Sequence, residues 1–464
     1  MPQRCIRLVT GLGGLLLTFG VVLGLGLPSS AGGEAARAEE QQPTGYLHTV
    51  GAKIVDSAGR EVQLTGVNWF GMETGTFAPH GLWARNWQDM LDHVVAMGFN
   101  TIRLPFSNQM LDPDSKRTEG VDYKINPDLQ GLSGLQVMDK IIKGAGERGL
   151  KIILDRHRPG IDGQSNLWYT DRYSEQRWID DWVMLAKRYA GNDTVIGMDL
   201  HNEPHGEATW GSGDLKTDWR LAAERAGNAI LGVNPNLLII VEGVELYGND
   251  SFWWGGNLKG AVEYPVRLKV PNQLVYSSHD YGPGVYRQTW FDAPGFPANM
   301  PAIWRDHWGY LVEENIAPVL VGEFGGRSVG SDLEGTWQRA LMRYIKEHGL
   351  SYTYWSLNPN SGDTGGILND DWKTVNHAKL DMLKQHQWPL LKVEPTPTAT
   401  PAFAPSPTAP VASAGTPTPS EKLPPAVSSP GADAGEADSW PARLWSGIGR
   451  ALHTLLDALL QPRR

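Results

Sequence analysis

Two glutamates that follow short apolar runs are the residues best suited to chemistry. Glu203 lies in the stretch MDLHNEP and Glu323 in VLVGEFG. A glycosidic bond is cut by one carboxylic acid that protonates the leaving oxygen and by a second carboxylate on the opposite face of the sugar. If the two carboxyl groups lie about 5–5.5 Å apart, the second attacks the sugar directly and the configuration is retained. A lone glutamate at a strand end is more often a salt-bridge or capping residue, but this pair favours catalysis.

Further polar and aromatic side chains lie at equivalent places, near the ends of other apolar runs. Arg103 is expected to hold Glu323 ionised and oriented, and Tyr281 to donate a hydrogen bond to the same carboxylate. Glu203 needs a raised pKa to act as an acid, and a desolvated pocket near Glu323 would raise it. The full set of neighbours is Arg103, His157, Asn202, His279, Tyr281 and Trp355.

The remaining neighbours have roles that suit sugar binding. Asn202 is placed to bond the 2-hydroxyl of the sugar, a contact that strengthens in the transition state. Trp355 is expected to form the sugar platform at the cleavage point. His157 and His279 would bind hydroxyls or tune the glutamates, although a single histidine is about as often purely structural.

The elements that must position these residues alternate along the chain. Helical stretches such as NWQDMLDHVVAMG and SGLQVMDKIIKGAGERG have the 3.6-residue period and end on glycine. Eight strands joined by helices predict a (β/α)8 TIM barrel with extended loops, in which all carboxyl strand ends meet at one face. A doubly wound open sheet is the alternative, but no glycine-rich phosphate loop supports it. The predicted strands span residues 61–69, 99–106, 151–157, 195–204, 237–244, 274–282, 317–325 and 351–358.

A metal centre is the first alternative to acid/base chemistry. Asp155 and Glu323, with His157 and His279, could form a His/carboxylate site of the barrel hydrolase type. No H-x-H or H-E-x-x-H spacing supports it. We therefore predict neither a metal nor a cofactor.

Composition restricts the class of partner. The formal net charge is −10, and no basic stripe of the kind that binds nucleic acid is present. The 19 tryptophans are roughly three times the usual share. Some must belong to the core, but flat apolar faces also stack on the C–H sides of sugar rings. The composition thus favours a carbohydrate partner over nucleic acid.

The amino-terminal segment resembles a secretory signal. Arg4 and Arg7 precede an apolar run at residues 8–27, and Ala36-Arg37-Ala38 ends the segment. This pattern predicts a signal peptide at residues 1–38 and a secreted, extracellular protein without an integral membrane span in its mature form. A retained membrane anchor is the alternative. Cys5 is the only cysteine, so the mature chain has no disulfides.

The carboxyl-terminal part changes in composition. A Pro/Thr/Ser-rich linker, expected to be disordered, is predicted at residues 393–438, because such a segment cannot build a core. Residues 439–464 have apolar side chains at helical spacing, and predict a short amphipathic helix without an assigned function. The catalytic domain would then span residues 44–392. The chain is expected to be a monomer.

Several motifs together resemble glycoside hydrolase family 5, close to its bacterial endo-β-1,4-glucanases. They are GVNWFGMET, HGLW, NTIRLPFS, LDRHRPG, MDLHNEPH, SSHDYGP and VGEFGG. The resemblance implies that Glu203 is the acid/base and Glu323 the nucleophile, with the six neighbours named above completing the active-site set. Arg156, Arg158 and Asp199 lie in matching motifs without a clear role. The resemblance also suggests that the substrate cleft is lined by Trp83, Trp254 and Gln288.

The resemblance leaves the substrate and two other classes of function open. No cellulose-binding module follows the linker, so soluble or amorphous β-glucan is favoured over crystalline cellulose. The same mechanism would act on β-mannan, xyloglucan or mixed-linkage glucan. A non-catalytic sugar-binding barrel would have lost one of the glutamates, and both are present. A scaffold attached to a surface through residues 439–464 is a third alternative.

Overall fold

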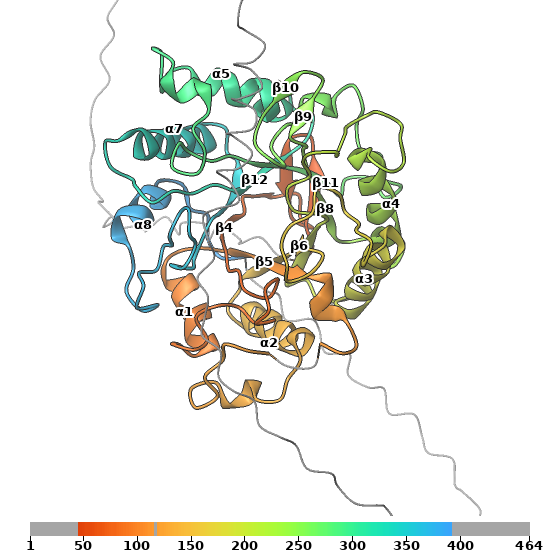
Figure 1. Cartoon of the computed structure of the whole chain (residues 1–464), viewed down its shortest axis with the longest axis vertical. Coiled ribbons are helices and arrows are strands. Elements are labelled where there is room, and N and C mark those ends of the chain that lie inside the picture. The colour runs from red at the N-terminus through yellow and green to blue at the C-terminus, as the bar shows by residue number, and fades with distance from the viewer. Residues whose placement is uncertain (1–44, 116–117, 392–464) are drawn as a thin grey trace, which may run out of the picture. The chain divides into compact units, whose positions relative to one another are not determined.

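Eight parallel strands close into a barrel in the computed structural model, which describes residues 45–115 and 118–391 (Figure 1). Neighbouring strands follow one another in chain order, and the last pairs with the first. The predicted barrel is confirmed, and the open doubly wound sheet is excluded. The strands are β4 (Thr65–Asn68), β5 (Thr101–Ser107), β6 (Lys151–Arg158), β7 (Val195–Asp199), β8 (Leu238–Glu242), β11 (Leu274–His279), β12 (Val319–Glu323) and β13 (Ser351–Tyr354).

Helices surround the barrel and connect most of its strands (Figure 1). The connection from β8 to β11 departs from the repeat, because its described residues hold a small hairpin and a 3₁₀ turn where an α-helix is expected. That hairpin consists of β9 (Leu246–Tyr247) and β10 (Asp250–Ser251). The helices are α1 (Trp87–Ala96), α2 (Gly134–Glu147), α3 (Glu175–Arg188), α4 (Trp219–Leu231), α5 (Met300–Trp304), α6 (Tyr310–Glu313), α7 (Leu333–Glu347) and α8 (His377–Leu383), and a π-turn at Arg305–Gly309 joins α5 to α6.

Side-chain caps fix where the outer helices begin. Ser133 and Gln136 form a reciprocal capping box at the start of α2. Such caps satisfy amide groups that the first helical turn leaves without partners. Asn86, Ser174, Asp218 and Asp332 cap α1, α3, α4 and α7 through single side chains. These local signals fix the residue at which each connecting loop ends and its helix begins.

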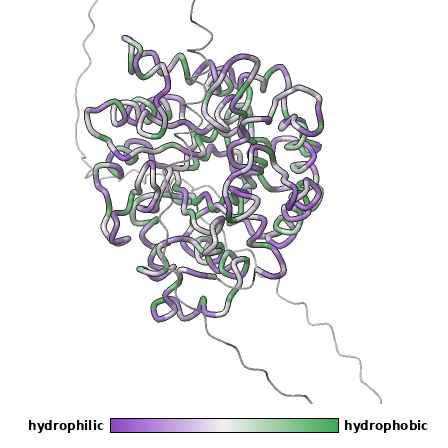
Figure 2. Tube along the Cα trace, viewed as in Figure 1, coloured by the Kyte–Doolittle hydropathy of each residue, from purple (hydrophilic) through white to green (hydrophobic). Residues whose placement is uncertain are grey.

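Most of the tryptophans belong to the core between barrel and helices. Figure 2 shows hydrophobic segments alternating with hydrophilic ones along the outer helices, as a one-sided packing surface requires. Packing in the core, and not only contact with sugars, therefore explains many of the tryptophans. Fully buried examples are Trp69, Trp168, Trp178, Trp182, Trp219, Trp304, Trp308 and Trp337.

A small antiparallel sheet packs near the amino ends of the barrel strands. It is formed by β1 (His48–Val50), β2 (Lys53–Val55) and β3 (Glu61–Val62). Ile54 and Val62 from this sheet share a buried cluster with Leu238 and Leu320, which lie at or next to the first residues of β8 and β12. The opposite, carboxyl ends of the strands are thereby left for chemistry.

Three predicted segments lie outside the described residues: the signal at 1–38, the linker at 393–438 and the tail helix at 439–464. Within the described residues, no helix has the length and apolarity that a bilayer crossing needs. The boundaries 44 and 392 of the catalytic domain stay a prediction.

Candidate active site

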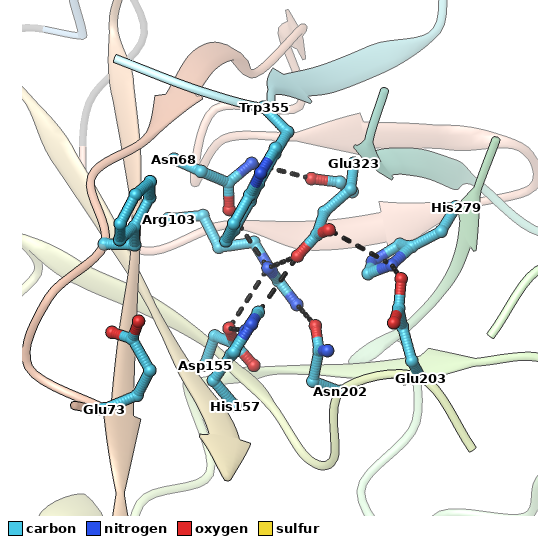
Figure 3. A network of polar contacts seen from close by, with 12 residues as sticks. Asn68, Glu73, Arg103, Asp155, His157, Asn202, Glu203, His279, Glu323 and Trp355 are labelled. Atoms are coloured by element: carbon cyan, nitrogen blue, oxygen red, sulfur yellow. Dashed lines mark hydrogen bonds and ion pairs between the residues drawn. The ribbon is translucent and has the colours of Figure 1, made fainter. Parts of the chain in front are cut away.

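The carboxyl ends of the strands bring the predicted residues together. Arg103 lies within β5 and His157 within β6, while His279 and Glu323 are the last residues of β11 and β12. Figure 3 shows these side chains converging from different strands on one network. Glu203 was predicted to close a strand, but β7 ends at Asp199 and Glu203 lies in the following loop.

Glu323 is held by two donors. Arg103 Nη1 donates to Glu323 Oε1 over 2.6 Å, and Tyr281 Oη donates to Oε2 over 2.7 Å. Charge-assisted hydrogen bonds of this kind are short and fix a carboxylate in position. Glu323 is 3% exposed, so few other groups compete for its oxygens. The predicted contacts of Arg103 and Tyr281 with this carboxylate are present in the structure.

Arg103 is the centre of a larger buried cluster. Its guanidinium lies 2.8 Å from Asp199, 3.1 Å from Asp155 and 3.2 Å from Glu242, in addition to Glu323. Burial opposes its charge, but these carboxylates raise the pKa of Arg103 well above its ordinary value. Burial also raises the pKa of both Asp155 and Asp199 to about 6. One guanidinium thus fixes several strand ends relative to one another.

Sequence reasoning overlooked part of this cluster. Asn68, the last residue of β4, accepts a hydrogen bond from Arg103 Nη1 over 3.0 Å. Glu242, the last residue of β8, was also missed. Both follow the rule that identified Arg103 and Glu323, a polar residue at the end of an apolar strand, so that rule applied to every strand would have found them.

Glu203 has an unusual backbone and three side-chain or main-chain partners. Its φ is +54°, in the left-handed region that residues other than glycine seldom adopt. Its amide donates to Glu242 Oε2 over 2.8 Å. Its Oε1 lies 3.0 Å from His279 Nδ1, and its Oε2 accepts from Gln164 Nε2 over 3.1 Å. The carboxylate is therefore bonded at both oxygens.

The pKa of Glu203 corrects one prediction. Burial is the largest single influence and acts to raise it, but the hydrogen bond and positive charge of His279, taken together with His157 and Gln164, outweigh burial. The net result is a pKa below the ordinary value for glutamate. The expectation of a raised pKa was wrong for this state because it considered desolvation without the histidine that a different strand supplies.

The two glutamates lie close to each other. One oxygen of Glu203, one of Glu323 and one ring nitrogen of His279 are all within 4.8 Å of one another. His279 Nδ1 bridges the pair, at 3.0 Å from Glu203 and 3.6 Å from Glu323. The nearest oxygens of the two glutamates are therefore closer than the about 6.5–9.5 Å that separates the carboxyl groups of inverting glycosidases.

Comparison with known proteins identifies the family of the chain. Residues 55–361 match the family model for cellulase, glycosyl hydrolase family 5. The chain belongs to glycosyl hydrolase family 5. The predicted resemblance, the cellulase type of hydrolase and the barrel are thereby confirmed.

Individual relatives of this family 5 hydrolase are similar over most of their length. An endoglucanase of Paenibacillus polymyxa is 58% identical over 385 residues, which is 82% of this chain and 97% of the relative. The catalytic domain of the major endoglucanase of Xanthomonas campestris is 46% identical, covers 73% of this chain and 99% of its own, and superposes with a TM-score of 0.70. An endocellulase of Pyrococcus horikoshii is 45% identical, with 74% and 99% coverage and a TM-score of 0.70.

The pKa values of the two histidines of the site are shifted in opposite directions. Burial lowers the pKa of His157 to about 4, so its ring is neutral near pH 7 and its Nδ1–H donates to Asp155 over 2.7 Å. His279 faces Glu242, Glu323 and Glu203, and these carboxylates, despite burial, raise its pKa well above the ordinary value. The family 5 hydrolase therefore carries the positive charge of His279 beside Glu203 and the neutral ring of His157 beside Asp155.

Aromatic faces flank the two glutamates. Trp355 stacks on His157 with ring centroids 5.3 Å apart and on Phe70 at 5.2 Å. His80 continues this row to Trp83, which is 40% exposed. Of the other predicted cleft residues, Trp254 stacks at 3.7 Å on His205, two residues after Glu203, and Gln288 is half-buried in the loop after β11.

Three of the four donors of the metal alternative lie together, whereas His279 groups with Glu203 and Glu323. Asp155, His157 and Glu323 offer ligand atoms within 4.8 Å of one another. However, the guanidinium of Arg103 pairs with both of these carboxylates. A cation bound there would lie against a buried positive charge, so the residues do not fit a metal centre.

Proposed function

We propose that this family 5 hydrolase is a retaining endo-1,4-β-glucanase, with Glu323 as nucleophile and Glu203 as general acid/base. The observation that carries the proposal is the close approach of the two carboxylates, within 4.8 Å through one oxygen of each. Retaining enzymes need this short separation because the nucleophile itself must reach the sugar. The donors around Glu323 hold its carboxylate in a fixed position, as a nucleophile requires.

In the first step, a Glu323 oxygen attacks the anomeric carbon while the bond to the leaving oxygen breaks. Glu203 gives its proton to that oxygen, so the leaving chain departs as a neutral alcohol. Arg103 and Tyr281 keep Glu323 aimed at the anomeric carbon. Because the pKa of Glu203 is low in the free enzyme, its proton must be held more tightly once substrate displaces water and the Gln164 contact.

In the second step, Glu203 takes a proton from a water molecule that attacks the glycosyl-enzyme, and Glu323 leaves as a carboxylate. Two displacements restore the original configuration. Asn202 is placed to assist both steps: its Oδ1 accepts from Arg103 over 2.9 Å. Its Nδ2 is buried without a hydrogen-bond partner among residues 45–115 and 118–391. We propose that Nδ2 donates to the sugar 2-hydroxyl.

The substrate class rests on relatives and on the aromatic faces. The relatives named above are endoglucanases and an endocellulase, and the Pyrococcus horikoshii enzyme forms complexes with cellotetraose. We propose that Trp355 is the platform for the sugar at the cleavage point. Trp83, Trp254 and Gln288 would contact neighbouring sugars. The partly exposed ring of Trp83 suits a long, open chain better than a chain end.

Reducing-sugar release tests the substrate. Carboxymethylcellulose, β-mannan, xyloglucan and mixed-linkage glucan are incubated in parallel with the same amount of enzyme. We expect cleavage of carboxymethylcellulose with a rapid fall in viscosity, as internal cuts produce. Cleavage of mannan alone would contradict the β-1,4-glucan assignment. Proton NMR of the first product, before mutarotation, tests retention, and an α-anomer would contradict the mechanism.

Replacement of the glutamates tests their roles. Glu323→Ala is expected to lose several orders of magnitude in kcat while it still binds cellotetraose in calorimetry. Near-normal turnover of this variant would contradict the nucleophile assignment. Glu347 is exposed, so Glu347→Ala is the control and should leave both measurements unchanged. Glu334 is buried, and Glu334→Ala is therefore unsuitable as a control.

We also propose that the protein is secreted as a monomer after removal of residues 1–38. A relative in Xanthomonas campestris is a major extracellular endoglucanase, 46% identical over 338 residues. Mass spectrometry of protein from the culture medium would give the mature amino terminus, and light scattering its mass. Retention in the membrane fraction would favour the anchor alternative.

A further inference from the structure

Glu242 is a third glutamate within the active-site cluster, at the carboxyl end of β8. Its side chain is fully buried, and both of its oxygens are used. Oε2 accepts the amide of Glu203 over 2.8 Å. Oε1 lies 3.2 Å from Nε2 of His279 and 3.2 Å from Nη2 of Arg103. Glu242 thus touches the backbone of the acid/base and two side chains that contact the catalytic pair.

The first consequence concerns the backbone of Glu203. A left-handed residue other than glycine keeps its conformation only when its surroundings fix it. The bond from the Glu203 amide to Glu242 fixes the left-handed turn at the residue whose carboxylate must be aimed. Gly255 leaves room for that bond, since a Cβ at this position would collide with Glu242 Oε2 and lie 3.1 Å from Glu203 Cα.

The second consequence concerns His279. Glu242 faces its Nε2, and Glu203 faces its Nδ1 at 3.0 Å. A carboxylate on one ring nitrogen fixes the orientation and proton position of the ring, as carboxylates behind catalytic or metal-bound histidines do. With Glu242 ionised, Nε2 keeps a proton that faces Glu242. The raised pKa of His279 keeps the second proton on Nδ1, where it faces Glu203.

We propose that Glu242 is a positioning residue for acid/base catalysis, which acts on Glu203 both through its main chain and through His279. The inference rests on the proposed role of Glu203. Glu242 itself touches no reacting atom, because its oxygens are occupied by Glu203, His279 and Arg103. Its removal should therefore affect proton transfer more than bond cleavage by Glu323.

Two substrates separate these effects. Cellotetraose needs a proton on its leaving oxygen, whereas 2,4-dinitrophenyl β-cellobioside releases an acidic phenol that needs none. Glu242→Gln keeps the shape but places an NH2 group against donors of His279 or Arg103. We expect kcat/KM on cellotetraose to fall by about 10²-fold or more, and kcat/KM on the dinitrophenyl substrate to stay within about threefold.

The pH profile gives a second readout that a purely structural role would not move. Burial raises the pKa of Glu242 to about 8, so its charge acts mainly on the alkaline side of the profile. Loss of that charge leaves His279 less positive there, and a less positive His279 stabilises the ionised form of Glu203 less. The alkaline limb of kcat/KM on cellotetraose should therefore move to higher pH in Glu242→Gln. An unchanged limb would contradict an action through His279.

Glu245→Gln is the matched control. Glu245 lies three residues further along the chain and accepts the amide of Gly206 over 3.0 Å, in the same loop as Glu203. Its replacement should leave both substrates within about threefold. Should Glu242→Gln lack a cooperative thermal transition, Glu242→Asp keeps the charge and shortens the reach. It should show the same preference for the dinitrophenyl substrate, with a smaller loss on cellotetraose.

Glu203→Ala in the same assay distinguishes a failure of the Glu242 positioning role from a failure of the Glu203 acid/base assignment. If it loses activity on cellotetraose only, and the Glu242 variants lose both substrates equally or neither, the positioning role is overturned and the acid/base assignment stands. If Glu203→Ala itself loses both equally, the acid/base assignment fails, and the role of Glu242 fails with it.

Discussion

Tyr281 Oη lies 2.7 Å from Glu323 Oε2 and donates its only proton to that carboxylate. The phenol is buried, and the charge of Glu323 helps to raise the pKa of Tyr281 well above its ordinary value, after burial itself. The hydroxyl therefore stays a donor over the whole working pH range. It orients the oxygen of Glu323 that is not bonded to Arg103.

Tyr281→Phe should accordingly lower kcat/KM on cellotetraose by about 10- to 100-fold, since a hydrogen bond to a charged group contributes about 1.5–3 kcal/mol. Steady-state kinetics checks this. Tyr247→Phe is the matched control, because Tyr247 Oη donates to Glu263 over 2.8 Å on the β9–β10 hairpin, away from the site. Equal losses in the two variants would contradict a specific role for Tyr281.

Gln164 provides a test of how the Glu203 carboxylate is tuned. Its exposed amide donates to Glu203 Oε2 over 3.1 Å and contributes to the lowered pKa of that group. Gln164→Ala removes a bond to the ionised form, so the pKa of Glu203 rises and the carboxyl stays protonated to higher pH. We expect the alkaline limb of the kcat/KM profile to move to higher pH.

Asn166→Ala is the control for that shift. Asn166 is a second amide side chain on the same loop, and its Nδ2 donates to Glu207 instead of Glu203. Its profile should coincide with that of the wild type. A shift to lower pH in Gln164→Ala, or equal shifts in both variants, would contradict the contact as the cause.

The barrel and the two glutamates were predictable because both depend on local pattern. Apolar runs form the strands, and a polar residue such as Arg103 or Glu323 at the carboxyl end of a run must lie at the shared face. The loop position of Glu203 was not predictable from period alone, since the chain leaves β7 before the Asn-Glu-Pro motif. The amide of this left-handed residue is bonded to Glu242, which another strand supplies.

The electrostatics of the site could not be predicted from sequence. Apolar neighbours in the sequence predict the desolvation of Glu203. They do not predict the N–H of His279, which comes from a distant segment, faces the Glu203 carboxylate and lowers its pKa. Likewise, the charge of Arg103 is shared among carboxylates from several strands. Such balances depend on distances of a few tenths of an ångström, which motif spacing does not contain.

Lys379 provides a stability prediction outside the site. Its ammonium group is buried and donates to the carbonyl of Thr364 over 2.7 Å, and burial lowers its pKa to about 8 from an ordinary value near 10.5. Between these two values the unfolded chain binds a proton that the folded protein does not. The free energy of unfolding of the wild type therefore gains a contribution that grows as the pH rises from about 8 to 10.5.

Lys379→Met lacks this contribution. Relative to the wild type, the free energy of unfolding of the variant should therefore fall by about 3 kcal/mol as the pH rises from about 8 to 10.5. Chemical denaturation at several pH values checks it. Lys384→Met, which removes an exposed lysine on the neighbouring 3₁₀ turn Lys384–His386, should give a difference that does not change with pH. A constant difference for Lys379→Met would contradict the buried, easily deprotonated lysine.

Removal of metal ions should not affect catalysis. Asp155, His157 and Glu323 lie close enough to bind a cation, but Arg103 already places a positive charge 3.1 Å from Asp155 and 2.6 Å from Glu323. Dialysis against a strong chelator is therefore expected to leave kcat/KM on carboxymethylcellulose unchanged, and added divalent ions should not raise it. Loss of activity that zinc or another divalent ion restores would show that a metal takes part, and would require Arg103 to leave the position it occupies between the two carboxylates.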